Sequence, residues 1–167
     1  MERDEALPLL DQLVVALRTA LAAPNAEAHR LFSAANRALH GLPADVLSEA
    51  RIEALLLSAQ FAYVSGQPFS GIEHSSLAVE CARRVRDDKA LRKALTFHGI
   101  LLADTGNIAT AVECYAEALD LAERLHEVRI KAPSAVEICF HSSGRLAAIQ
   151  AIASLETALY AGHPQDL

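Results

Sequence analysis

The chain of 167 residues is poor in several features that define other classes of protein. No apolar run approaches the ~18 residues of a membrane span, and the acidic, polar start MERDEA does not have the form of a signal peptide. The three cysteines form no C-x-x-C pair and no even disulfide set, which favours a reducing, cytoplasmic setting. The formal net charge of −6 argues against general affinity for nucleic acid. We therefore expect neither a membrane nor a nucleic acid as partner.

Signatures of catalytic and cofactor sites are also missing. The sequence has no G-x4-G-K-S/T phosphate loop, no G-x-G-x-x-G loop and no G-x-S-x-G turn. Its seven histidines form no H-x3-H pair and no His/Cys spacing of a zinc site. We expect no catalytic activity, cofactor or metal for this chain, and we interpret Cys81, Cys114 and Cys139 as small buried apolar residues.

Alanine and leucine supply most of the 52% hydrophobic content, whereas aromatic residues make up 5% and tryptophan is absent. Both abundant residues are strong helix formers, and long runs of valine, isoleucine and threonine are lacking. A chain of this length suits one domain with a buried core. The composition predicts a single all-α domain over residues 1–167.

The spacing of apolar residues predicts eight helices joined by short turns, which pair into four hairpins. We expect them at about 6–22, 26–40, 43–65, 69–85, 89–104, 107–125, 134–143 and 146–160. Asn25 and the Asp87–Asp88 pair are suitable N-caps, and Pro43 suits the first turn of the third helix. The most regular apolar stripe belongs to 107–125.

The stretch 95–118, LTFHGILLADTGNIATAVECYAEA, is the clearest hairpin, with a tight turn at 104–107. Its facing positions are Leu95, Gly99 and Leu102 on the first helix and Ala111, Tyr115 and Ala118 on the second. Because large residues alternate with very small ones, the two backbones can approach closely. This arrangement is typical of a hairpin that stacks on copies of itself.

A pattern of small residue, aromatic residue and small residue recurs in the second helix of each hairpin. Its copies are Ala28/Phe32/Ala35, a degraded Gly71/Ser75/Ala78, Ala111/Tyr115/Ala118 and Ile149/Ala153/Glu156, the last in spacing only. The intervals are 43, 40 and 38 residues (28 to 71, 71 to 111, 111 to 149). A competing register aligns AVEC at 78–81 with AVEC at 111–114. We reject it because it would align Gly106 with Glu73, inside a helix.

These residues resemble the helix-turn-helix signature of the tetratricopeptide repeat (TPR) family. The positions that match are Leu95, Gly99, Leu102, Gly106, Asn107, Ala111, Tyr115 and Ala118. His98 departs from the signature, because the family usually has an apolar residue there, and the period exceeds the usual ~34 residues. The resemblance implies a right-handed α-solenoid of about four hairpins. The long period is similar to arrays in bacterial regulators, which often precede a GGDEF diguanylate cyclase domain or a DNA-binding domain.

The resemblance also implies a partner-binding groove lined by the first helix of each hairpin. Its candidate residues are Glu53, Gln60, Tyr63, Lys93, Thr96, Ile100, Lys131, Ser134, Ile138 and His141. Each of them can equally be an ordinary solvated or packing residue. The clamp for a chaperone C-terminal carboxylate is not reproduced, because Lys131 alone matches it.

A second candidate is the basic run Arg83, Arg84, Arg86 and Lys89, a possible docking patch for an acidic partner. The alternative is that its first three members favour the dipole at a helix C-terminus, with Asp87 and Asp88 neutralising part of the charge. His98 is better explained as a half-buried, hydrogen-bonded histidine than as a ligand or base.

The sequence thus predicts a non-catalytic module that binds a protein or peptide, the N-terminal regulatory or sensor domain of a bacterial signalling protein. The last expected helix has apolar positions and no polar capping helix follows it. We therefore expect either continuation of the chain past Leu167 or a homodimer through the open end. The alternatives are a free-standing adaptor that self-associates and a receptor that binds a small ligand or peptide in the concave groove.

Overall fold

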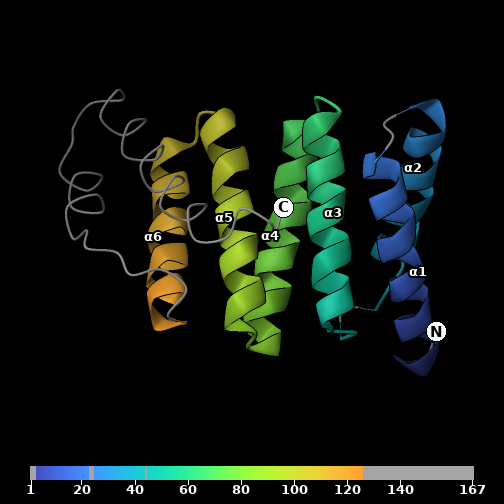
Figure 1. Ribbon diagram of the computed structural model, residues 1–167, viewed down its shortest axis with the longest axis horizontal. Helices are drawn as coiled ribbons and strands as arrows, with labels where there is room; N and C mark the ends of the chain where they lie inside the picture. Colours follow the sequence, from blue (N-terminus) through green and yellow to red (C-terminus); the bar gives the residue numbers. More distant parts are fainter. Residues whose placement is uncertain (1–2, 23–24, 44, 126–167) are drawn as a thin grey trace.

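The computed structural model describes residues 3–22, 25–43 and 45–125, and within these ranges every regular element is an α-helix. The helices are α1 (Arg3–Ala22), α2 (Ala26–His40), α3 (Glu49–Val64), α4 (Pro68–Val85), α5 (Asp88–Asp104) and α6 (Ile108–Arg124). In Figure 1 the helix pairs follow one another across the view in chain order, from α1 and α2 through α3 and α4 to α5 and α6. The all-α prediction is therefore confirmed for the described residues. The helices expected at 134–143 and 146–160 lie outside them.

Polar side chains begin several of the helices as the sequence predicts. Asn25 Oδ1 accepts hydrogen bonds from the backbone N–H groups of Glu27 and Ala28, both at 2.9 Å. Asp87 Oδ1 accepts from the N–H of Ala90 at 2.9 Å. Each cap supplies an acceptor to backbone donors that have no partner within the helix. Both predicted N-caps are confirmed.

The expected start of the third helix at Pro43 is wrong. α3 begins at Glu49, and Ser48 is its N-cap, with Oγ accepting from the N–H of Arg51 at 3.2 Å. The preceding connection is held to the helices by buried Val46 and by Arg51 Nη1, which donates to the carbonyl oxygens of Pro43 and Val46 at 2.5 and 2.8 Å. These contacts keep the connection out of helical conformation, even though proline alone would permit it.

Two helix endings 40 residues apart have the same geometry. Gly66 and Gly106 have positive φ angles of 74° and 87°, a conformation that glycine adopts without steric penalty. The following N–H groups, of Gln67 and Asn107, each donate to a carbonyl five residues back at 2.8 Å. These bonds satisfy helix carbonyls that would otherwise lack a donor. The tight turn predicted at 104–107 is thus confirmed between α5 and α6, and the turn between α3 and α4 repeats its geometry.

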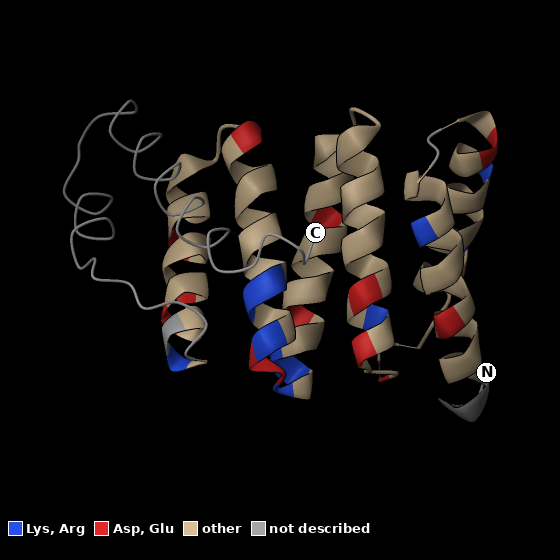
Figure 2. Cartoon of the chain, viewed as in Figure 1, with Lys and Arg blue, Asp and Glu red and all other residues tan. Residues whose placement is uncertain are grey.

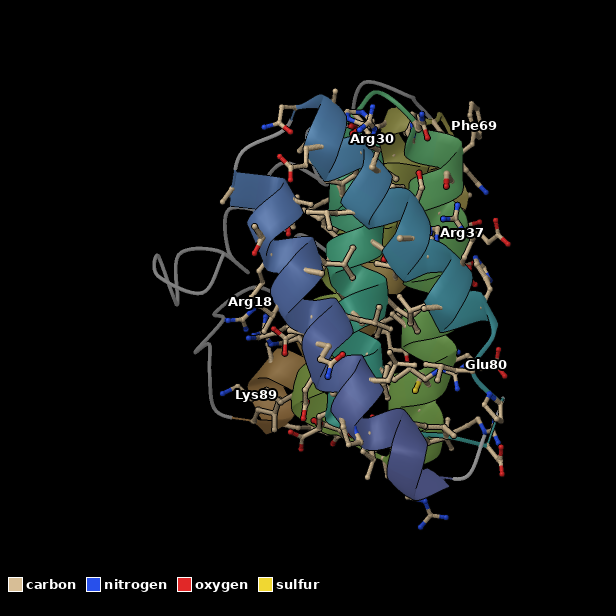
Figure 3. All side chains as sticks on the ribbon, turned by 90° about the vertical axis from the view of Figure 1, so that its right-hand side faces the viewer. Arg18, Arg30, Arg37, Phe69, Glu80 and Lys89 are labelled. Atoms are coloured by element: carbon tan, nitrogen blue, oxygen red, sulfur yellow. The ribbon has the colours of Figure 1, made fainter. Side chains whose placement is uncertain are left out.

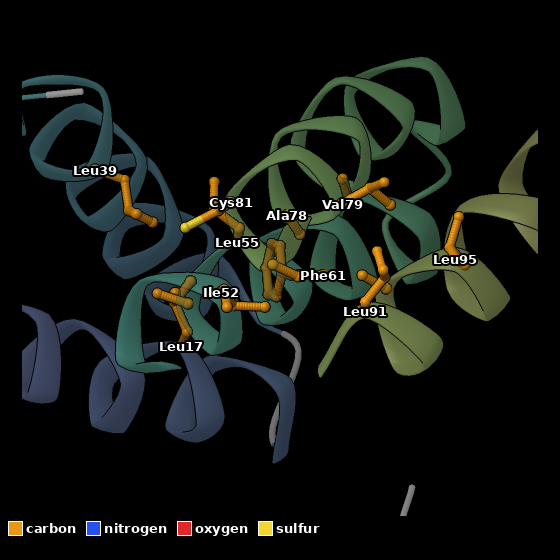
Figure 4. Close-up of a cluster of buried hydrophobic side chains, with 14 of the residues drawn as sticks. Leu17, Leu39, Ile52, Leu55, Phe61, Ala78, Val79, Cys81, Leu91 and Leu95 are labelled. Atoms are coloured by element: carbon orange, nitrogen blue, oxygen red, sulfur yellow. The ribbon is translucent and has the colours of Figure 1, made fainter. Parts of the chain in front are cut away.

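Consecutive helices pack as hairpins, and hairpins pack on one another. α3 pairs with α4 and α5 with α6, while α4 contacts α5, and α1 contacts both α2 and α3. Figure 4 shows Leu55, Phe61, Val79 and Leu91 from three of these helices meeting in the core. The described copies of the repeat pattern are all buried: Ala28, Phe32, Ala35, Gly71, Ser75, Ala78, Ala111, Tyr115 and Ala118.

Small residues set the distance between the helices. A Cβ atom at Gly99 would lie 2.8 Å from Cε1 of Tyr115, whose ring is fully buried. A Cβ atom at Gly71 would lie 3.1 Å from the carbonyl oxygen of Ala59 and 3.2 Å from a methyl group of Leu101. The absence of a side chain at these two positions therefore allows the close packing that the sequence predicts.

Gly99→Ala should destabilise the fold by about 1–3 kcal/mol, because the added methyl group overlaps a ring that has no room to move. Gly41→Ala is the matched control. Gly41 has φ of −77°, and its Cβ would meet nothing closer than 3.5 Å. Urea denaturation, followed by circular dichroism, measures the stability of both variants. Equal midpoints for Gly99→Ala and the wild type would contradict the role given to this contact.

Candidate functional site

α3 contacts both α1 and α5, and the predicted groove residues that the structure describes lie on α3 and α5. Two of them link neighbouring hairpins. Arg18 Nε of α1 donates to Glu53 Oε1 of α3 at 3.1 Å, and the two side chains form an ion pair. The Tyr63 hydroxyl of α3 donates to Asp104 Oδ2 of α5 at 2.7 Å, and the Tyr63 ring meets Phe97 edge-on at 6.2 Å between centroids. Glu53 and Tyr63, both predicted groove residues, therefore link one hairpin to the next.

The other predicted groove residues differ in how far a partner could reach them. Lys93 is exposed, and Gln60 and Ile100 are half-buried. Thr96 is only 5% exposed, and its hydroxyl donates to the carbonyl oxygen of Arg92 at 2.9 Å. The remaining candidates, Lys131, Ser134, Ile138 and His141, lie outside the described residues. The accessible part of the predicted groove is therefore Gln60, Tyr63, Lys93 and Ile100.

The predicted basic patch contains charges of both signs (Figure 2). Arg83 Nη2 is 2.6 Å from Glu117 Oε2 of α6, and Arg124 Nη2 is 3.2 Å from Asp88 Oδ2. These exposed ion pairs contribute roughly 0–1 kcal/mol each. Arg86 has a φ of 61° at the end of α4, and Lys89 is exposed in the first turn of α5. Arg84 lines a pocket on another side of α4.

His98 is half-buried and hydrogen-bonded, as predicted. Its Nδ1 lies 2.8 Å from Ser75 Oγ, and Ser75 Oγ donates to the carbonyl oxygen of Ile72 at 3.0 Å. Because a hydroxyl has one hydrogen, this arrangement makes the imidazole N–H the donor to Ser75. Burial lowers the pKa of His98. Ser75 stands where the repeat pattern calls for an aromatic residue, so the histidine from the next hairpin occupies space that a larger side chain would fill.

A pocket of about 310 Å³ lies between the end of α2, the α2–α3 connection, α3 and α4. Sequence reasoning did not find it, because its residues come from four segments and share no local spacing. Its walls are Leu39, Leu42, Leu47, Leu55, Leu77 and Cys81, together with the polar residues His40, Arg51, His74, Glu80 and Arg84. In Figure 4, Leu39 of α2 faces Leu55 and Cys81.

His74 is a polar residue in the wall of this pocket, with only 2% of its surface exposed. Its Nδ1 lies 2.7 Å from the carbonyl oxygen of Ser70, and a carbonyl can only accept, so Nδ1 carries the hydrogen. Nε2 has no hydrogen-bond partner among the described residues. Burial is the main cause that lowers the pKa of His74, and the Ser70 hydrogen bond opposes it.

The two described cysteines are buried and free, as predicted, while Cys139 lies outside the described residues. Burial raises the pKa of the Cys81 thiol, and it raises that of Cys114 to about 11. Both thiols are therefore protonated at neutral pH, which makes them poor nucleophiles.

Within the described part of the chain, no group of three or more His, Cys, Asp or Glu side chains is placed to hold a metal ion. None of the described helices is long and apolar enough to cross a membrane. No family model, curated protein or solved structure matched the chain. The likeness to tetratricopeptide repeats therefore rests on the residues of the chain itself.

Acidification should destabilise the protein through His74 and His98. Both have a lowered pKa in the folded state, so the unfolded chain binds protons first as the pH falls. Their contribution to the free energy of unfolding is fully present above pH ~6.5 and is lost as the pH drops below that value. Each histidine lowers this free energy by at most ~1.4 kcal/mol per pH unit. Melting temperatures between pH 7.5 and 5.5 measure this effect.

The double variant His74→Leu, His98→Gln should show a flatter profile over the same range, because glutamine can still bond to Ser75 and neither side chain titrates. A wild-type melting temperature that is constant or rises between pH 7.5 and 5.5 would contradict the argument.

Proposed function

We propose that the chain is a non-catalytic interaction module, built as a right-handed α-solenoid of TPR-like hairpins that binds a protein or peptide segment. The observation that carries this proposal is the recurrence of one unit. The endings at Gly66 and Gly106 share their φ sign and their hydrogen bonds, and the small residues Gly71 and Ala111, at matched positions of the repeat, are both buried. Stacked hairpins present an extended surface, and such surfaces are used for binding.

The proposed binding surface is the α1–α3–α5 face. Its accessible residues combine a cation, an amide, a phenol and an aliphatic side chain, namely Lys93, Gln60, Tyr63 and Ile100. A mixed polar and apolar surface suits an extended peptide or an amphipathic helix. The hydrogen bond between Tyr63 and Asp104 and the ion pair between Arg18 and Glu53 link the three helices on this side.

The same proposal includes a regulatory role. A partner that binds across several hairpins favours one relative arrangement of them, and that preference can be passed to an output domain, such as a GGDEF diguanylate cyclase domain, after residue 167. The coding sequence beyond residue 167 tests this part. An output domain there supports the regulatory role, and a stop codon contradicts it while leaving the binding proposal intact.

Binding on this face is tested with a peptide selected from a random display library against the intact chain. Lys93→Glu combined with Gln60→Arg should weaken the affinity of the chain for this peptide at least tenfold, which corresponds to ~1.4 kcal/mol of binding free energy. Fluorescence polarisation measures the affinity. Glu113→Lys, which reverses an exposed charge on α6, is the matched control and should change the affinity less than twofold. Selected peptides that are insensitive to the α3–α5 changes would contradict the proposal.

A further inference from the structure

The pocket beside α4 lies on a different side of the molecule from the proposed interaction face. In Figure 3, Arg18 of α1 is at one edge of the protein, and Glu80, which lines the pocket, is at the opposite edge. The pocket volume of about 310 Å³ is at the lower end of the range for small-molecule sites. The occupant that it suits is therefore small.

The connection between α2 and α3 creates this space. Residues 41–48 join these helices, whereas only residues 86–87 join α4 to α5. The longer connection contributes Leu42 and Leu47 to the pocket wall, and Arg51 secures it from α3. The pocket therefore lies where this connection is longer than its counterpart between α4 and α5.

Arg51 is positioned to recognise an anion. Its Nη1 uses both hydrogens on the carbonyl oxygens of Pro43 and Val46, which fixes the guanidinium group on the pocket wall. Nε and Nη2 make no hydrogen bond to the described residues, and these two groups form the edge that pairs with both oxygens of a carboxylate. The side chain is half-buried, so its interaction with an anion is less screened than on an open surface.

The rest of the wall fits an aliphatic chain. Five leucines surround the space, from α2, the connection, α3 and α4. Arg51 places a positive charge on this wall, so the pocket suits a ligand with one negative charge. Burial of the ligand's methylene groups against leucine supplies affinity, and the arginine supplies orientation.

We propose that this pocket binds a small aliphatic monocarboxylate, with its carboxylate on Arg51 and its hydrocarbon chain among the leucines. The site is separate from the peptide-binding face, so either proposal can fail without the other. A peptide that ends in leucine also joins a carboxylate to an aliphatic group. The small acid is favoured because the pocket volume of about 310 Å³ is at the lower end of the range for small-molecule sites.

Isothermal titration of the intact chain with octanoate, below its micelle concentration, tests the proposal, with octanol as the uncharged probe. Octanoate should bind with a dissociation constant below 1 mM, and octanol at least tenfold more weakly. Equal binding of the two, or no binding of octanoate, overturns the proposal. Tighter binding of acetyl-alanyl-leucine than of octanoate overturns it in favour of a peptide C-terminus.

Three variants locate the site. Arg51→Lys keeps a positive charge and can still donate to the α2–α3 connection. It loses the Nε and Nη2 groups that form a bidentate pair with a carboxylate, so it should weaken octanoate binding at least tenfold. Leu77→Trp fills the pocket from its rim, where Leu77 is 38% exposed, and should abolish binding without touching Arg51. Val64→Trp adds the same side chain at an exposed position outside the pocket and should bind octanoate as the wild type does. Unchanged binding by Leu77→Trp overturns the assignment.

Discussion

The close approach of α5 and α6 at Gly99 is the contact on which the rest of the described fold depends. The space that a Cβ atom would need is filled by the edge of the Tyr115 ring, and that ring is wholly removed from solvent. A large side chain on one helix thus requires the smallest residue on the other. Gly71 of α4 plays a similar part, because it meets the backbone of α3 within its own hairpin and a leucine of α5 in the next hairpin. These contacts fix both the spacing within a hairpin and the spacing between hairpins.

Two irregular places in the repeat contain buried or half-buried polar side chains. Ser75 replaces the expected aromatic residue, and a hydrogen-bonded histidine from the next hairpin fills the space. The α2–α3 connection is longer than its counterpart, and the pocket with Arg51 and His74 forms beneath it. A buried nitrogen without a partner, as at His74, is a departure from the rule that buried polar groups are satisfied, and such departures gather at functional sites.

Local signals in the sequence predicted most of the described helices, because apolar spacing, N-caps and turn glycines act over a few residues. The predicted start of α3 was wrong for the same reason. Pro43 is a local signal for a helix start, but the contacts of Ser48, Val46 and Arg51 place the start at Glu49 instead. The site was less accessible to sequence reasoning. One residue along a helix is a rotation of ~100°, so Thr96 is buried while Phe97 is half exposed. The pocket depends on residues that only the tertiary fold brings together.

The helices form a stack in which each depends on its neighbours, so the stability of each helix should follow the number of helices that flank it. Native-state hydrogen exchange of the intact chain tests this most directly. α3 and α4 have packed helices on both sides, whereas α2 packs mainly on α1. The slowest amides of α3 and α4 should exchange more slowly than any amide of α2. Equal or greater protection in α2 would contradict it.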